Sequence, residues 1–518
     1  MNDTKAMACK KDQKHNLDVE LVKSGGQEGT ITVKPLSLID QFRALKTHKH
    51  AVLAAFACST TPILIGYDLT LIGSIIANTE FIHTIGTYDE NLGSWSLPAR
   101  QQLIWTIVQY VSAILAALGS GSLNDMVGRR ICFYITIGLT VCGTLIELFS
   151  PSWKIWAVAK LFMGAAMGSM QANTQTYVSE ITPTPIRGIT LSLFQFWIIL
   201  GQLIASCVLE GTSHVDSSWS WKGAVVSQFG PALFCLAMFI PFVPESPYFL
   251  VAKGRLDDAK AAISRLRAGE NISCDEELLA IQETLAHERQ SKEMSPSFLE
   301  CFQGTNLRRT LLACLPLVMQ IFMGYPLCGN YLSYFLTLSG MDNAFLITLI
   351  SVICSIIAGT VAFGLVERVG RRNQLLVGSC GMLLCLLVIS LLGFFGAGEK
   401  WNYRALAAFC IIWAVFYFGS VGAVGWTIMA EVSSSRLRAK TTSIAALSSS
   451  LFNMVWSIAI PYLVNKESAN LGPKSALLFF GFSVILWGIC FLCLPETKGK
   501  SFAELDALFE AHTPARKF

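Results

Sequence analysis

Two ionisable residues, Asp68 and Lys160, stand inside long apolar runs of this chain. Asp68 lies within ILIGYDLTLIGSII at 63–76, and no residue within four positions of it carries a charge. A charge inside a membrane is costly, so it marks a candidate functional site together with its partner. Counted at about 1.5 Å per helical residue from the ends of their runs, both side chains lie at similar depth. We therefore predict that Asp68 and Lys160 form an ion pair within the membrane.

This pair could carry a proton. Burial of a carboxylate favours its neutral form, whereas a neighbouring cation favours its charged form. A Lys160 that moves toward and away from Asp68 would therefore switch the proton affinity of Asp68. The alternative is a static salt bridge that locks two helices together.

Amide and aromatic side chains within the apolar runs form a second candidate site. Amides bind polyols well because each offers donors and an acceptor, and a tryptophan face gives an apolar platform for a sugar ring. For any single amide, the alternative is a hydrogen bond that joins two helices. Together these residues predict a neutral polar cavity; they are Gln195, Gln202, Gln320, Asn330, Gly422, Trp426 and Asn453.

Charged residues at helix ends form a third group, which occurs twice along the chain. VGRR at 127–130 returns at 369–372, the Glu180 and Arg187 pair returns as Glu431 and Arg438, and PES at 244–246 returns as PET at 495–497. Arginines beside carboxylates form charge-assisted hydrogen bonds, so we expect a cytoplasmic gate whose contacts hold the two halves together. The alternative is that these are loop charges that follow the positive-inside rule. The gate candidates are Arg129, Arg130, Glu180, Arg187, Glu245, Arg371, Arg372, Glu431, Arg438 and Glu496.

The composition places these residues in a membrane protein. Of 518 residues, 53% are hydrophobic and 14% are charged, whereas soluble domains have about 25% charged residues. Apolar runs of about 20 residues are long enough to cross a bilayer as helices. We predict an all-α protein with twelve such spans, at 51–78, 101–122, 131–149, 153–179, 189–209, 226–243, 310–338, 344–366, 374–396, 402–430, 441–464 and 475–494.

The spans and the duplicated motifs divide the chain into two six-helix bundles, at 51–247 and 309–494. Between them, the polar segment 248–308 has apolar residues at three- and four-residue spacing, which predicts short amphipathic helices on the cytoplasmic face. Parallel repeats of this kind are typical of transporters that bind substrate between the halves near the bilayer midplane. We expect a disordered tail at 1–50 and a second tail at 495–518. Lysine and arginine are concentrated in every second loop between the spans and in the two tails, which predicts that both termini are cytoplasmic.

Several other kinds of function find little support in the sequence. Most of the 16 cysteines lie within the spans, and their spacing indicates no metal site or disulfide framework. The net charge of +4 reflects the excess of lysine and arginine in the loops on one side of the membrane, and it does not indicate nucleic-acid binding. No nucleophile–base pair or phosphate-binding loop predicts an enzyme.

The quoted motifs resemble the signatures of the sugar porter family of the major facilitator superfamily. They are GYD at 66–68, both copies of VGRR, YVSEITPTPIRG at 177–188, PESPYFL at 244–250 and PETKG at 495–499. Within that family, RGITLSLFQFWIILGQLIA, SSSRLRAKTTSIA and the tail FAELDALFEAHTPARKF look like the fungal maltose and α-glucoside permeases. The resemblance implies the major facilitator fold, protonation of Asp68, Lys160 in the place of an arginine, and sugar binding by the amides, Gly422 and Trp426.

The chain also departs from the family pattern. Ile321 and Pro326 replace the second glutamine and the asparagine of the hexose-porter motif. Ile65 stands where the maltose type carries a glutamate, the second span lacks a further acid, and Met126 replaces an arginine. These departures motivate a second hypothesis, an exporter or facilitative carrier of a sugar-derived or other small metabolite.

The leading hypothesis is a monomeric plasma-membrane transporter that imports a sugar, an α-glucoside such as maltose, together with a proton by alternating access. Its expected partners are the sugar, the proton and the lipid bilayer, and its energy source is the proton gradient without any cofactor. A third hypothesis is a sugar sensor, although sensors of this kind carry longer cytoplasmic tails.

Overall fold

The computed structural model describes residues 46–511 and 514, with several gaps. Positions 90–93, 269–272, 293–297, 340, 342, 396–399, 434–436, 465–468 and 499–501 are not described. The tail predicted to be disordered at 1–50 therefore lies almost entirely outside the described residues.

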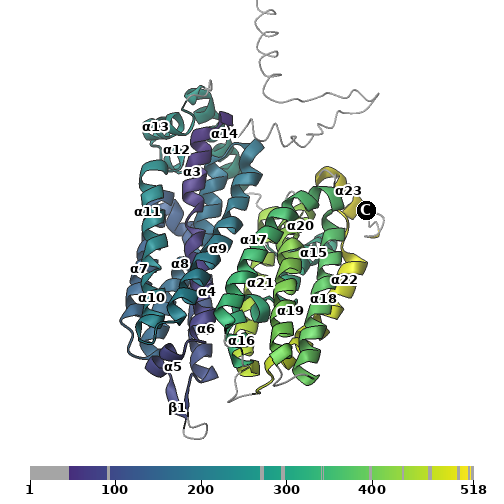
Figure 1. The fold of residues 1–518 in the computed structure, drawn as a ribbon. Helices are drawn as coiled ribbons and strands as arrows, with labels where there is room; N and C mark the ends of the chain where they lie inside the picture. Colours follow the sequence, from purple (N-terminus) through teal and green to yellow (C-terminus); the bar gives the residue numbers. More distant parts are fainter. Residues whose placement is uncertain are drawn as a thin grey trace, which may run out of the picture.

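The first half of the chain folds into one helical bundle, shown in purple to teal in Figure 1. A short antiparallel hairpin, β1 (Thr87–Asp89) and β2 (Ser94–Ser96), lies at one end of it; we call this end the hairpin face. The helices of the bundle are α3 (Lys49–Ser59), α4 (Pro62–Ile75), α5 (Thr79–Ile85), α6 (Ala99–Val127), α7 (Arg129–Leu148), α8 (Trp153–Ile181), α9 (Thr184–Ser213), α10 (Trp219–Val226) and α11 (Phe229–Phe242).

The second half forms a similar bundle beside the first, shown in green to yellow in Figure 1. Its elements are α15 (Gly304–Phe322), the π-helical turn η2 (Pro326–Asn330), α16 (Leu332–Leu338), α17 (Ala344–Val369), α18 (Arg371–Phe395), α19 (Lys400–Gly419), α20 (Val421–Val432), α21 (Arg438–Val464), η3 (Gly472–Ser475) and α22 (Ala476–Cys493), followed by α23 (Phe502–Glu510).

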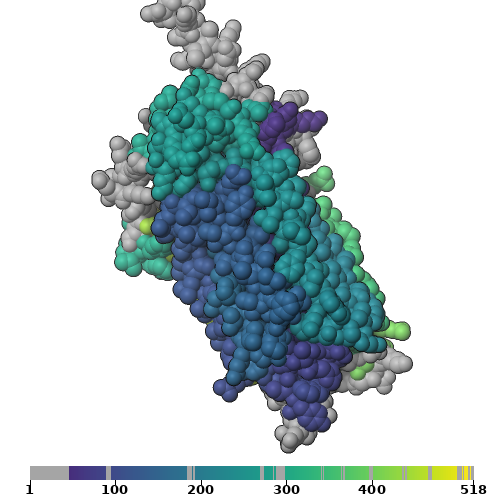
Figure 2. Space-filling view, turned by 90° about the vertical axis from the view of Figure 1, so that its left-hand side faces the viewer, coloured from purple at the N-terminus to yellow at the C-terminus, as the bar shows by residue number. Residues whose placement is uncertain are grey.

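The predicted amphipathic helices between the bundles are present. They are α12 (Pro247–Ala252), α13 (Leu256–Leu266), α14 (Cys274–Lys292) and the 3-10 turn η1 (Phe298–Phe302). Phe249, Leu250, Ile263, Leu278 and Ile281 bury their side chains against one another, so α12, α13 and α14 share a small core. These helices form the end opposite the hairpin (Figures 1 and 2), which we call the linker face.

Ten helical segments of the described chain are long and apolar enough to cross a membrane. Two predicted spans are missing from this set. In one of them a charged residue, and in the other a helix break, interrupts the apolar helix. In 153–179, which corresponds to α8, Lys160 lowers the local hydropathy. In 310–338 the helix itself breaks at Gly324, whose φ of 90° is left-handed, just before Pro326. Because partner helices can satisfy the freed backbone groups, such breaks are tolerated within membranes.

The first predicted span is also broken, between α3 and α4. Pro62 has no N–H and therefore cannot continue the backbone hydrogen bonds of α3. The hydroxyl of Thr60 donates to the carbonyl of Ala57 at 2.8 Å, and that of Thr61 donates to the carbonyl of Cys58 at 3.0 Å. These bonds add to the backbone hydrogen bonds that the same two carbonyls accept at the break, and α4 then begins the segment that carries Asp68.

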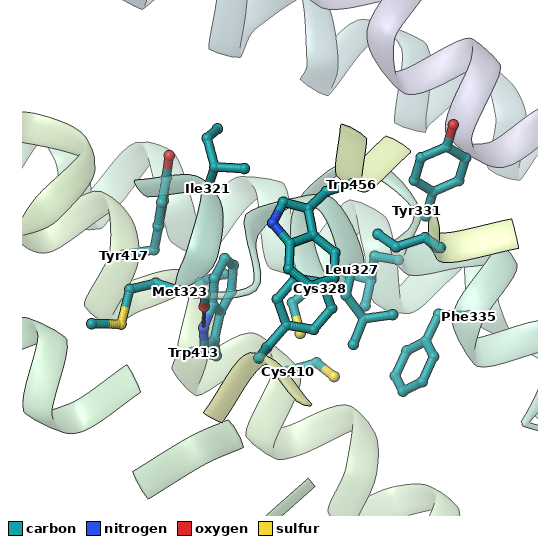
Figure 3. Close-up of a cluster of buried hydrophobic side chains, with 14 of the residues drawn as sticks. Ile321, Met323, Leu327, Cys328, Tyr331, Phe335, Cys410, Trp413, Tyr417 and Trp456 are labelled. Carbon is teal, nitrogen blue, oxygen red and sulfur yellow. Dashed lines mark hydrogen bonds between the residues drawn. The ribbon is translucent and has the colours of Figure 1, made fainter. Parts of the chain in front are cut away.

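The core of the second bundle is rich in aromatic and sulfur-containing side chains (Figure 3). Trp413 is fully buried and donates its indole N–H to the carbonyl of Met323 at 2.9 Å, so it satisfies a backbone group beside the break at Gly324. Tyr417 stacks on Trp413, with ring centroids 5.2 Å apart, and on Tyr325, at 4.8 Å. This stack holds the broken segment between α15 and η2 against α19.

Candidate proton and substrate site

The predicted ion pair between Asp68 and Lys160 is present in the structure. Lys160 Nζ lies 3.1 Å from Asp68 Oδ1, and the two side chains are almost entirely buried. The Lys160 ammonium also lies 5.3 Å from the ring centroid of Trp156, one turn earlier on α8. The pair joins α4 to α8.

Lys160 has a second carboxylate partner that the sequence analysis left out. Its Nζ lies 2.5 Å from Glu147 Oε1, and Glu147 has no exposed surface. Glu147 stands near the end of α7, and its other oxygen, Oε2, accepts a hydrogen bond from Gln228 Nε2 at 3.1 Å. The available signal was an acid inside the predicted span 131–149, which is the same signal that drew attention to Asp68.

The second oxygen of Asp68 is bound by a neutral amide. Gln109 on α6 donates from Nε2 to Asp68 Oδ2 at 2.7 Å. Close packing of α6 against α8 makes this contact possible, because a Cβ at Gly164 on α8 would lie 2.2 Å from the Gln109 carbonyl oxygen. Four helices therefore converge on a buried cluster of Asp68, Glu147 and Lys160, which we call the charged triad.

The two halves meet near the hairpin face. Ser74 Oγ on α4 lies 3.0 Å from Ser333 Oγ on α16, and Gln102 Nε2 on α6 donates to the Tyr334 hydroxyl at 3.5 Å. A Cβ at Gly73 would lie 1.7 Å from the carbonyl oxygen of Asn330, so the backbones are in direct contact there. Figure 1 shows α16 beside α6. These contacts close the space between the halves on this side.

Two cavities lie between the halves, just inside these contacts. The first has a cavity volume of about 20 Å³ and is lined by Leu69, Ile72, Gly73, Thr106, Gln109, Tyr110, Met167, Asn330, Tyr331 and Ser457. The second has a cavity volume of about 30 Å³, and its polar lining includes Thr70, Ser74, Gln202, Tyr325, Asn330, Thr348, Ser351 and Ser355. Gln109 therefore contacts the charged triad and also lines the first cavity.

Of the predicted substrate residues, Gln202 and Asn330 line these cavities. Gln202 and Tyr325 line the second cavity side by side. Asn330 lines both cavities, and its Oδ1 is buried with no hydrogen-bond partner among the described residues.

The other five predicted substrate residues are not among the lining of the two cavities. Gln320 Nε2 donates to the carbonyl of Val421 at 2.9 Å, which joins α15 to α20. Gly422 packs against Tyr417, and Trp426 on α20 is 40% exposed. Gln195 is half-buried on α9, and Asn453 Oδ1 on α21 is buried with no hydrogen-bond partner in the described part of the chain.

Several cavity residues were not predicted from the sequence. Tyr110 and Thr106 of the first half and Tyr331 and Ser457 of the second line the first cavity together, so their side chains lie where the two halves meet. These residues are tyrosines, a threonine and a serine, which belong to neither the charged nor the amide pattern. Because such residues are common within helices, the sequence gave no reason to predict them as cavity residues.

The predicted gate charges form one network in each half. In the first, Arg129 Nη2 lies 2.9 Å from Glu180 Oε1, and the backbone N–H groups of Arg129 and Arg130 donate to Glu245 at 2.9 and 3.2 Å. Ser246 donates to Glu180. These contacts fasten the start of α7 to the ends of α8 and α11.

The second network repeats this arrangement. The backbone N–H groups of Arg371 and Arg372 donate to Glu496 at 3.0 and 3.2 Å, Arg371 Nε lies 3.4 Å from Glu431 Oε1, and Thr497 donates to Glu431 at 2.5 Å. We expected these charges to hold the halves together, but each of these contacts between described residues joins helices of one half. The reason is geometric: each partner named here comes from the same copy of the repeat.

Two gate residues cannot be placed in these networks. The side chains of Arg187 and Arg438 lie outside the described residues, although their backbones belong to α9 and α21.

Comparison with known proteins gives a consistent picture. The model of the family described as "Sugar (and other) transporter" matches residues 53–509. The general alpha-glucoside permease of Saccharomyces cerevisiae is 31% identical over 92% of this chain and 78% of its own length. The major facilitator-type transporter ecdD of Aspergillus rugulosus is 29% identical over 88% of this chain and 86% of its own length.

The fold is similar to that of solved transporters. The inward-open structure of the xylose transporter XylE from E. coli superposes with a TM-score of 0.70 and 21% sequence identity, over 88% of this chain and 98% of that one. The fold is therefore the major facilitator fold with twelve membrane helices, as predicted. The chain is a multi-pass membrane transporter and belongs to the sugar (and other) transporter family.

Proposed function

We propose that the protein is a proton symporter that carries a sugar of the α-glucoside class across the membrane. The observation that carries this proposal is the link between a buried ion pair and a polar cavity. Asp68 is paired with Lys160 and bound by Gln109, and Gln109 lines the space between the halves. A proton on Asp68 and a sugar in the cavity would therefore act on the same helix, α6.

The names of similar proteins support the substrate class. The yeast relatives are alpha-glucoside permeases, and a structural neighbour is described as a proton:xylose symporter. The cavity agrees with a polyhydroxyl ligand, since amides and hydroxyls line it and the lining of neither cavity carries a charged side chain. Gln202 and Asn330 would bind the sugar. As the halves move, further residues would also contact it, namely Gln195, Gln320, Gly422, Trp426 and Asn453.

Alternating access supplies the transport step. We assign the hairpin face to the outside and the linker face to the cytoplasm, with both termini cytoplasmic, because lysine and arginine gather on the linker side. The contacts of Ser74 with Ser333 then close the outer side, and the half-exposed Trp426 agrees with an opening toward the cytoplasm. The Arg129 and Arg371 networks would hold each bundle rigid while the bundles rock.

Asp68 and Lys160 would couple this motion to the proton. Protonation of Asp68 removes its charge and releases Lys160 from that partner, which lowers the electrostatic attraction between α4 and α8. The energy source would be the proton gradient, with no cofactor, in a monomer at the plasma membrane.

Uptake of labelled maltose tests the proposal, in cells that lack their own permeases, with and without a protonophore. We expect accumulation above the outside concentration that collapses when the protonophore is added. Uptake that ignores the protonophore would contradict symport, and absence of maltose uptake from a correctly targeted protein would contradict the substrate class.

A further inference from the structure

The charged triad contains one more carboxylate than a simple ion pair needs. Lys160 Nζ lies 3.1 Å from Asp68 Oδ1 and 2.5 Å from Glu147 Oε1. The nearest oxygens of the two carboxylates are therefore separated by no more than the sum of these distances. Neither Glu147 nor Lys160 has any exposed surface, and Asp68 is 5% exposed.

The charge count follows from these contacts. With both carboxylates ionised, the triad has a net charge of −1 around a single ammonium. The remaining contacts are neutral: Gln109 on Asp68, Gln228 on Glu147 and the Trp156 ring beside Lys160. Among the described residues, Tyr110 is a further titratable side chain that interacts with Asp68, and it is neutral and lines the first cavity together with Ser457. A buried site with an unbalanced charge is unfavourable, and binding of one proton makes it neutral.

We infer that Glu147 is a positioning residue for proton coupling, which holds Lys160 when Asp68 takes up the proton. This inference rests on the proposed symport. The proton enters on a carboxylate oxygen of Asp68, the ammonium keeps its charge, and Lys160 stays with Glu147. When the proton leaves toward the cytoplasm, Asp68 regains its charge and Lys160 again serves both carboxylates.

Glu147 would thereby give the triad the uncompensated charge that one proton neutralises. Two carboxylates that share one site hold a proton more readily than either alone. Without Glu147, Asp68 and Lys160 form a balanced pair that has no charge to neutralise. A lysine between two carboxylates also has a partner in either protonation state, so its charge is never left alone in a buried site.

The test compares Glu147→Gln with wild type and with two controls. Glu147→Asp keeps the charge. Thr144→Val changes a buried residue one turn earlier on α7, whose hydroxyl donates to the carbonyl of Thr140, without changing the charge. The purified proteins are titrated by infrared spectroscopy for the band of a protonated carboxyl group, which Asp68→Asn identifies by its loss. The same variants are assayed for maltose uptake against external pH.

For Glu147→Gln we expect the midpoint of the Asp68 band, and with it the midpoint of uptake, to move about one to two pH units toward acid. Glu147→Asp and Thr144→Val should stay near wild type. An unchanged midpoint of the band in Glu147→Gln would overturn the role of Glu147. If the midpoint moves but wild-type uptake ignores the protonophore, the shared proton site stands and the proposed symport fails.

Discussion

Gln109 on α6 donates its side-chain amide to Asp68 Oδ2 over 2.7 Å. The next residue on the same helix, Tyr110, lines the first cavity together with Ser457 of the other half. Two consecutive residues of α6 therefore contact the Asp68 carboxylate and lie where the two halves meet. Under the proposed function, this arrangement would link protonation of Asp68 to the interface between the halves.

Replacement of Asp68 by asparagine should abolish accumulation of sugar while leaving exchange partly intact. Asparagine keeps the shape of the side chain but cannot bind the proton, so sugar can still move down its own gradient. The measurement is uptake of labelled maltose into energised cells beside exchange in de-energised vesicles. Asp258→Asn is the matched control, because Asp258 is 55% exposed and pairs with the similarly exposed Arg255 on the linker face. Accumulation at the wild-type level in Asp68→Asn would return this residue to a structural role.

Replacement of Gln109 by leucine should reduce accumulation about tenfold. The Asp68 carboxylate would lose a hydrogen-bond donor, and bonds to charged groups contribute about 1.5–3 kcal/mol. Gln101→Leu is the control on the same helix, since Gln101 is buried but its Oε1 accepts no hydrogen bond from the described residues. Equal losses in the two variants would show that general packing of α6, and not its bond to Asp68, explains the effect.

A disulfide between positions 74 and 333 should trap the transporter with its hairpin face closed. The hydroxyls of Ser74 and Ser333 are 3.0 Å apart, which is close enough for cysteines at these positions to approach disulfide geometry. Oxidation of the Ser74→Cys, Ser333→Cys double variant should stop uptake, and a reductant should restore it. Each single variant serves as a control for reactions of the native cysteines. Full uptake after verified cross-linking would mean that this contact stays closed throughout transport.

Replacement of Glu245 by glutamine should destabilise the first bundle by about 1–2 kcal/mol. Its carboxylate accepts the backbone N–H groups of Arg129 and Arg130, so the change weakens a charged cap at the start of α7. Glu496→Gln should act similarly at α18. Thermal melting of the purified protein measures the loss. Asp258→Asn should have little effect, because Asp258 and Arg255 form an exposed ion pair and such pairs contribute about 0–1 kcal/mol. An unchanged melting temperature in both glutamine variants would contradict a stabilising role for the two networks.

The helical membrane architecture could be predicted from the sequence, and so could the meeting of Asp68 with Lys160. Hydropathy and helical rise are local properties, so they determine which segments cross the membrane and how deep each residue lies. Depth alone brings Asp68 and Lys160 to one level. The repeat of VGRR with its acids likewise predicted that these arginines and carboxylates pair, although the pairs were expected to join the two halves.

Only the tertiary structure decided which side chains meet at a given depth. Contacts between helices depend on the rotation of each helix about its axis and on breaks such as those at Pro62 and Gly324, which local patterns do not determine. Those rotations bring Glu147 and Gln109 to the charged pair and place Asn330 in the cavities. They also keep the arginine networks within their own halves, because each motif packs against its own copy of the bundle.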